Sequence, residues 1–393
     1  MEPDAGLCNT MPSPLRRSLA SSFSRAVTKL NSLFPAKNRT CAPYAWRAEP
    51  PRWTLRVARS HFIKRLPTEI LAWIFVLGAE DDDMLPVTVS HVCSRWRAIA
   101  LHTPSLWRRI PLGPQERMWR ERIYRAKACP LDVRLLSWRP VRAGGIVVRQ
   151  ALDVHTVQLC MHLVSPSIHR WRSLEITLPE YQPFLANAAL SPCCSRKRRA
   201  KALLLEELTL VYRLNDDTKE FCLFSGHTPR LRRLTVDGLR LTWLPSLFQN
   251  LTFLDFTHHG FSAGDEAVSE LLSMLTVCAG LRELRILFPR KSLARPPGAF
   301  YAFMRRVTLP WLVRLHLRVE TGDIPSELAR LVTHLSTPAL TSLYLIDLGR
   351  RRHAFPSLTL FMRTYPALHA LETVYLEHGW HGSFVSRRRG RRE

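Results

Sequence analysis

One short segment has residue types and a spacing that could perform nucleophilic catalysis. Gly260, Ser262 and Gly264 fit the pattern G-x-S-x-G, between an expected strand over 251–256 and an expected helix over 265–278. A nucleophile elbow places its serine on such a strand-to-helix turn. A serine hydrolase would also need an acid and a histidine in that order downstream. The chain offers Asp323, followed by His334, His353 or His369.

Other features of the same segment argue against catalysis. His258 and His259 lengthen the turn beyond a tight corner, and no HGGG-type oxyanion loop precedes it. The chain also contains no P-loop, GxGxxG or HExxH motif. The histidines are scattered, and we expect each of them, His258 and His259 included, to be a surface residue. We therefore predict that the chain is not an enzyme, has no catalytic residue and binds no cofactor.

The cysteines indicate the compartment. Their number, nine, is odd, and none of them forms a CxxC pair. This pattern disfavours both a disulfide scaffold and a structural zinc site. The N-terminus shows no secretory signal, and the longest apolar run, Ile70 to Ala79, is about half the length that a membrane span needs. We expect a protein of the cytoplasm, the nucleus or both, with no bound metal and no membrane association.

The charge is strongly positive. The 393 residues contain 57 Lys and Arg against 32 Asp and Glu, a formal charge of +25, and only eight of the basic residues are lysine. A nucleic-acid-binding surface would concentrate this charge on one face. The arginines are instead spread along the chain, apart from runs at 196–201 and 387–392. Nucleic-acid or chromatin binding is therefore the alternative and not the leading interpretation.

A leucine-rich unit recurs from about residue 165 onward. It has the form Leu-x-x-Leu-x-Leu, where the last position also accepts Ile, Val or Phe. Its central leucines are 20 to 34 residues apart, at positions 174, 208, 234, 254, 284, 315, 343 and 371. Such spacing is typical of leucine-rich repeats, in which short strands point alternate leucines into a shared core. Helices over 265–278 and 326–335 would cover that core, and an ordinary α/β domain with leucine-rich strands is the alternative.

The region 61–112 has a different, helical pattern. Pro67 suits the first turn of a helix, and Ile70, Leu71, Ile74 and Phe75 follow at helical spacing. Further helical patterns start near Pro86 and run through Val89 to Ala100. A unit of this size cannot bury all its apolar faces alone, so it must pack against a partner or another domain.

Residues 66–110 resemble an F-box, in the variant common in large fungal F-box families. The resemblance rests on Leu66–Pro67, Glu69–Ile70–Leu71, Ile74–Phe75, Val92–Cys93, Trp96–Arg97 and Pro104 to Trp107. It covers about an eighth of the chain. In that family the helical unit docks on a Skp-type adaptor, which sits on a cullin scaffold carrying a RING ubiquitin ligase.

The resemblance also implies which residues contact the adaptor. Carried over by position, they are Leu66, Pro67, Ile70, Leu71, Val92, Cys93 and Trp96. Apolar anchors at helical spacing fit helix-in-groove recognition, and a tryptophan such as Trp96 often dominates the binding energy. We expect Ile74, Phe75 and Ile99 to serve internal packing instead.

Together these patterns predict an α+β multidomain chain, with a small three-helix F-box followed by an irregular α/β leucine-rich-repeat-like solenoid. The predicted parts are a disordered basic tail (1–60), the F-box (61–112), a repeat domain that binds a protein substrate (113–380) and a basic C-terminal tail (381–393). A basic amphipathic stretch between Leu15 and Phe34 could also target an organelle. The predicted function is substrate recognition for a Skp–cullin–F-box ubiquitin ligase in ubiquitin-dependent protein degradation.

Overall fold

The computed structural model describes residues 62–113, 115–136, 138–143, 146–194, 201–289, 305–320, 324–348, 361, 373–378 and 385–388. The chain divides into two compact units, with the boundary between Leu106 and Trp107. The expected tail over 1–60, with its amphipathic stretch, lies outside the described residues. Among the described residues, no helix has the length and apolar character needed to cross a membrane.

The first unit is helical. Its elements are α2 (Phe62–Arg65), α3 (Thr68–Gly78), α4 (Leu85–Ser90) and α5 (Ser94–His102), and a 3-10 helix, η1 (Pro104–Trp107), spans the boundary. The first two expected helices are confirmed as α3 and α4. The third, expected from Val89 to Ala100, begins later as α5, because Val89 belongs to α4 and residues 91–93 lie between the two helices. Pro67 immediately precedes α3 and Pro86 lies in the first turn of α4. Proline has no backbone N–H, but at these positions an N–H would have no partner within the helix, so no hydrogen bond is lost.

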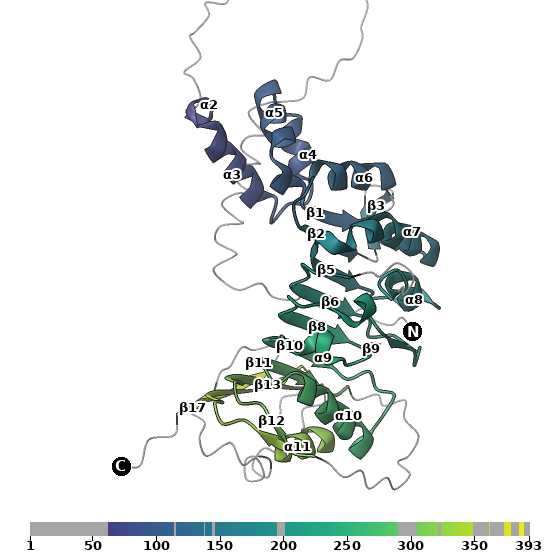
Figure 1. Ribbon diagram of the computed structural model, residues 1–393, viewed down its shortest axis with the longest axis vertical. Coiled ribbons are helices and arrows are strands. Elements are labelled where there is room, and N and C mark those ends of the chain that lie inside the picture. The colour runs from purple at the N-terminus through teal and green to yellow at the C-terminus, as the bar shows by residue number, and fades with distance from the viewer. Residues whose placement is uncertain are drawn as a thin grey trace, which may run out of the picture. The chain divides into compact units, whose positions relative to one another are not determined.

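The second unit contains an 11-stranded sheet in its described part (Figure 1). In sheet order the strands are β1 (Arg109–Leu112), β2 (Leu131–Leu136), β5 (Trp171–Thr177), β6 (Glu207–Val211), β8 (Arg233–Asp237), β10 (Phe253–Thr257), β11 (Glu283–Leu287), β13 (Arg314–Val319), β15 (Ser342–Asp347), β16 (Thr373–His378) and β17 (Val385–Arg388). All neighbours pair in parallel except β16 and β17, which are antiparallel.

The parallel pairing aligns the predicted leucines across the sheet. Leu174, Leu208, Leu234, Leu254, Leu284, Leu315 and Leu343 occupy matching positions on consecutive strands and are buried. Two residues further along each strand, a second buried row runs from Leu112 through Leu210 and Leu317 to Leu345. Since side chains alternate across a strand, both rows lie on one face of the sheet and form its core.

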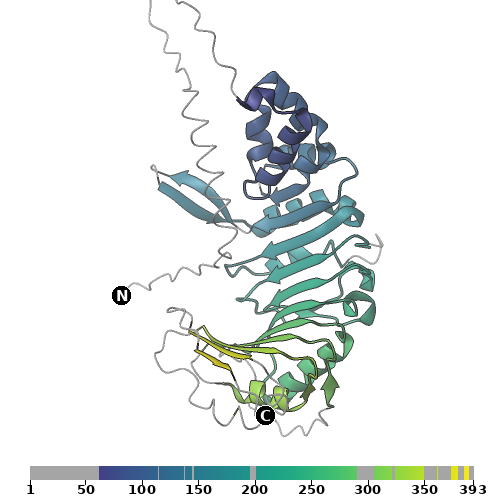
Figure 2. The same cartoon turned by 90° about the vertical axis from the view of Figure 1, so that its left-hand side faces the viewer.

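Helices cover the leucine face. They are α6 (Glu116–Arg125), α7 (Val154–Val164), α8 (Leu185–Leu190), α9 (Pro245–Phe248), α10 (Gly264–Val277) and α11 (Ser326–Thr333), with the 3-10 helices η2 (Ser165–Arg170) and η3 (Phe224–Gly226). Figure 2 shows the strands of this unit stacked in a curved sheet with the helices on one side. The helices expected over 265–278 and 326–335 are confirmed as α10 and α11. The residues between the two leucine rows point to the other face, which we call the open face.

Three pairs of strands lie outside the main sheet. They are the antiparallel hairpin β3 (Trp138–Ala143) and β4 (Ile146–Ala151), and the parallel pairs β7 (Glu220–Phe221) with β9 (Arg240–Leu241) and β12 (Val307–Thr308) with β14 (Leu335–Ser336). The hairpin projects away from the sheet in Figure 2.

The sheet differs from the expected repeat at both ends. It begins with β1 and β2, well before the first predicted repeat near residue 165. On β16 the residue opposite Leu343 is Val374, and Leu371 lies outside the described residues, so the last predicted unit was placed too early. Strand β17 lies inside the segment expected to be a basic tail. The first and last strands of the sheet are set by backbone pairing, and the spacing of leucines does not reveal that pairing.

Candidate functional site

Helix α3 has apolar side chains on both of its faces. Leu71 and Phe75 are buried in the first unit. Ile70, Trp73 and Leu77 are 47%, 68% and 57% exposed, and their i, i+3, i+7 spacing places them together on the opposite face. A helix that is hydrophobic all round is normally buried on every side. The exposed half of α3, which we call the α3 apolar face, is therefore a candidate docking surface.

Contacts from α5 reach both α3 and the segment that leads into it. Arg95 donates from its two terminal nitrogens to the carbonyls of Lys64 and Leu66, at 2.7 Å each. The Trp96 ring packs against the Phe75 ring, with 4.9 Å between their centroids. The α3 apolar face is therefore exposed although α3 itself is packed against the rest of the unit.

The structure leaves most of the predicted contact residues accessible. Of these, Pro67, Ile70, Val92 and Cys93 are exposed, and Leu66 and Trp96 are half-buried. Leu71 is fully buried, so it can affect docking only through the packing of α3. Phe75 and Ile99 are buried as expected, and Ile74 is half-buried. Trp73 and Leu77 were not among the predicted contacts, although their spacing from Ile70 was a usable signal.

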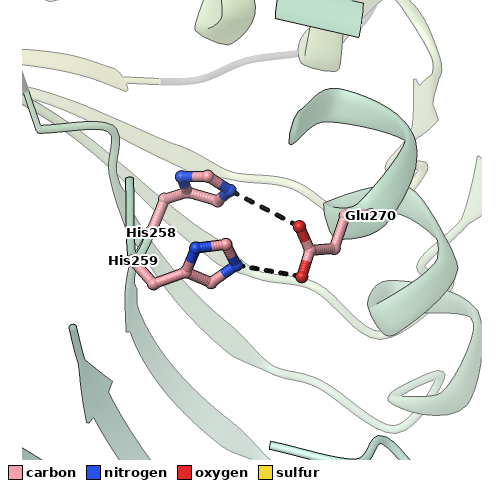
Figure 3. Close-up of side chains that lie close together, drawn as sticks. All are labelled: His258, His259 and Glu270. Carbon is pink, nitrogen blue, oxygen red and sulfur yellow. Dashed lines mark hydrogen bonds and ion pairs between the residues drawn. The ribbon is translucent and has the colours of Figure 1, made fainter. Parts of the chain in front are cut away.

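The second unit contains a cluster of polar side chains at the junction of β10 and α10. His259 Nε2 lies 3.0 Å from Oε1 of Glu270, and His258 Nε2 lies 3.7 Å from Oε2 (Figure 3). The Ser262 hydroxyl donates to Oε2 of Glu270 at 2.9 Å. Both histidines are buried, which corrects the expectation that they are surface residues.

The ligand atoms of His258, His259 and Glu270 lie within 4.8 Å of one another, a separation that suits a metal ion. The hydrogen bonds of the rings oppose this role. The backbone N–H groups of Gly260 and Phe261 donate to the Nδ1 atoms of His258 and His259, at 3.1 and 3.0 Å. Each neutral ring therefore carries its proton on Nε2, whereas a metal at Nε2 needs that proton on Nδ1. The cluster fits a hydrogen-bonded clamp between loop and helix.

The same bonds bear on Ser262 as a nucleophile. Its hydroxyl lies 3.2 Å from Nε2 of His258, but that nitrogen carries a proton and cannot accept one. The Nδ1 atom, which a triad acid should hold, accepts the Gly260 N–H instead. Of the predicted triad partners, Asp323, His353 and His369 lie outside the described residues. His334 contacts Thr333 and the Arg330 carbonyl at the end of α11.

Replacing Glu270 by glutamine should destabilise the second unit by about 2 kcal/mol, because charge-assisted hydrogen bonds are lost in a mostly buried place. Burial alone would raise the pKa of the Glu270 carboxyl, but hydrogen bonds from His258, His259 and Ser262 outweigh it and hold that pKa far below its ordinary value. The carboxylate thus contributes stability above about pH 4.3, which is lost as the pH falls further.

His258 gives a second contribution of the same sign. Burial lowers its pKa, so the unfolded chain takes up a proton below about pH 6.5 before the folded chain does. Denaturant titrations from pH 7 to pH 3 should show stability falling with pH in two stages. Glu270→Gln should flatten the lower stage and enlarge the upper one, because the Glu270 carboxylate also raises the pKa of His258 in the folded chain. A lower stage as steep as that of the wild type would show that the carboxylate does not form this clamp.

The open face carries an aromatic row at the carboxyl-terminal end of the sheet. His316 stacks on Tyr344 at 4.2 Å between centroids, and Tyr344 stacks on Tyr375 at 4.4 Å. Burial first, and the nearby Arg285 next, lower the pKa of His316 to about 4, so the ring is neutral near pH 7. Because the rings stack face to face on one another, mainly their edges are accessible to a partner. This does not suit the base stacking that single-stranded nucleic acid requires.

Comparison with known families assigns the first unit. Residues 63–112 match the family model described as F-box-like, and no curated protein matches the chain. The chain therefore carries an F-box-like domain, which confirms the resemblance seen in the sequence. This domain contains α3, α4 and α5 and with them the α3 apolar face. F-box domains generally bind Skp-type adaptors, which indicates an adaptor role in a ubiquitin ligase.

Proposed function

We propose that this protein is a substrate-recognition subunit of a Skp–cullin–F-box ubiquitin ligase. The carrying observation is the α3 apolar face, with Ile70, Trp73 and Leu77 exposed on a packed helix of an F-box-like domain. A Skp-type adaptor covers this face in the proposal, with Val92, Cys93, Leu66 and Pro67 as further accessible contacts. Tryptophan is among the residues that most often dominate an interface, which makes Trp73 the main anchor.

The proposal assigns target binding to the second unit, as a leucine-rich-repeat-like solenoid. Two features support it: the leucines stay in register over consecutive parallel strands, and the helices leave the open face free for other contacts. The chain itself performs no chemical step in this proposal. It accelerates ubiquitin transfer by holding a target near a charged conjugating enzyme.

The proposed compartment is the cytoplasm, the nucleus or both. Among the described residues the cysteines are free thiols, including the exposed Cys93. Free thiols persist in a reducing compartment, which is where a cullin-based ligase would work.

Capture of a Skp-type adaptor by the full chain tests the proposal. Wild type should bind the adaptor, and the double variant Ile70→Asp/Leu77→Asp should lose at least roughly 100-fold in affinity, because charges would be buried in an apolar interface. Tyr124→Asp is the matched control, since Tyr124 is 78% exposed on α6 in the other unit. Failure of the wild type to bind, or equal binding by the double variant, would overturn the proposal.

A further inference from the structure

A row of residues lies at the amino ends of the parallel strands, just before the leucine core begins. Backbone bonds define it: Thr252 donates to the Arg232 carbonyl, Arg282 to the Thr252 carbonyl and Val313 to the Arg282 carbonyl, each at 2.9 Å. Arg232 and Arg282 are therefore two strands apart, with Thr252 between them. Two strand spacings place their backbones about 10 Å apart.

An open hollow of about 300 Å³ lies over this row. It is lined by Arg232, Gln249, Asn250, Thr252, Gly280, Arg282 and Trp311. The lining contains two arginines and no carboxylate, and both arginines are exposed. Its volume falls at the lower end of the range for ligand sites. The hollow therefore presents a net positive charge without an acidic neighbour in its own wall.

One side of the hollow carries an arginine held by hydrogen bonds, and another side carries an exposed tryptophan. Arg232 donates from Nη1 to the Asn250 carbonyl at 2.9 Å, and Asn250 Nδ2 donates to the Pro229 carbonyl at 3.0 Å. These bonds fix the Arg232 guanidinium at the rim. Trp311, just before β13, is 64% exposed. Arginine and tryptophan are the residue types enriched at the energetic centres of protein interfaces.

A neighbouring hollow limits what can bind. It measures about 420 Å³ and is lined by Glu206, Glu207, Arg230, Arg232 and Arg233. Arg233 already pairs with Glu207 at 3.4 Å. A continuous polyanion such as nucleic acid, running along the rim from Arg282 past Arg232, would meet these two carboxylates. A short segment with only a few negative charges would not extend that far.

We propose that the hollow between Arg232 and Arg282 binds a short acidic segment of a protein target. In this arrangement the segment is a polyproline II helix, in which side chains three residues apart share a face and lie about 9 Å apart along the axis, so that two carboxylates at this spacing reach the two arginines. An apolar side chain next to them packs on Trp311. The inference rests on the proposed target-binding role of the second unit and names the chemistry of that target.

The test uses the full chain and fluorescent synthetic peptides with two glutamates separated by one to three residues and flanked by leucine, methionine or phenylalanine. Each peptide has a counterpart with glutamine in place of glutamate. Anisotropy should show that at least one acidic peptide binds about tenfold more tightly than its counterpart, with an affinity that falls as salt rises. Arg232→Gln/Arg282→Gln should abolish this preference, and Trp311→Ala should weaken binding about tenfold.

The matched control is Arg117→Gln/Arg120→Gln, which removes the same charge from exposed positions of α6 and should leave binding within about twofold. Acidic peptides that bind no better than their counterparts would overturn the inference, and so would equal binding by the hollow variants. Displacement by single-stranded DNA with the same dependence on Arg232 and Arg282 would assign the surface to nucleic acid. Adaptor capture is measured on the same preparations. If the chain captures the adaptor but shows no preference for acidic peptides, only this inference is overturned. If it binds the acidic peptides but does not capture the adaptor, the proposed function is overturned.

Discussion

Replacing Trp73 by alanine is expected to weaken adaptor binding roughly 100-fold, or by about 2.7 kcal/mol, while the stability of the helical unit hardly changes. The physical reason is the placement of the ring. Trp73 is mostly exposed in this chain, so its loss removes little internal packing. A partner that covers the α3 apolar face would bury the indole almost completely, and large aromatic rings contribute much of an interface's binding energy. Isothermal titration with a Skp-type adaptor measures the effect.

Trp96→Ala is the informative comparison for this prediction. The Trp96 ring packs on Phe75 inside the unit, so its loss should reduce the free energy of unfolding by about 2 kcal/mol. The two tryptophans thus separate docking from folding. An adaptor affinity that is unchanged in Trp73→Ala but lost in a folded Trp96→Ala would place the main anchor on α5, as the sequence analysis expected.

Leu284→Ala should destabilise the second unit by about 3 kcal/mol, because a fully buried leucine leaves a cavity that the surrounding strands cannot close. Leu284 pairs with Leu254 on one side and Leu315 on the other, so both neighbouring strands line the cavity. Adaptor binding should be unchanged, since the substitution lies outside the F-box-like domain. Chemical denaturation of the full chain, followed by circular dichroism, measures the loss.

Arg285→Ala is the control on the same strand. Arg285 points to the open face and is partly exposed, and the buried Glu283 keeps Arg314 as a second partner at 3.1 Å, so removing Arg285 should cost about 1 kcal/mol. If Leu284→Ala and Arg285→Ala had equal effects, the leucine row would not be the core of the sheet.

The candidate docking site shows what sequence periodicity can and cannot reveal. It correctly predicted a helix near Pro67, but it placed Ile70 and Phe75 on one apolar stripe, whereas Phe75 is buried and Ile70 is exposed on the opposite face. It could not divide that helix into an inner and an outer face, because α3 is apolar all round. The contacts of α4 and α5 decide that division, and they bury Leu71 while leaving Trp73 exposed.

The fold shows a similar limit. The spacing of the leucines identified seven aligned strands, since each carries the same short pattern. It missed β1 and β2, in which Ile110 and Val133 occupy the position that the central leucine takes in the other strands. It also placed His258 and His259 on the surface. Their burial depends on Glu270, which lies 11 residues beyond His259 and reaches them only because α10 folds back over the loop.

The antiparallel strand β17 has a consequence for how the protein behaves at high concentration. Among the described residues it forms the edge strand of the sheet at the carboxyl-terminal side, and two of its four residues, Arg387 and Arg388, are arginines. An unpaired sheet edge invites strand addition from another molecule and hence aggregation, and positive charge on an edge strand opposes it. Two molecules meeting edge to edge at β17 would bring like charges together. A truncation that removes β17 would instead make β16 the edge strand. The backbone donors and acceptors of β16 that now pair with β17 would then be exposed.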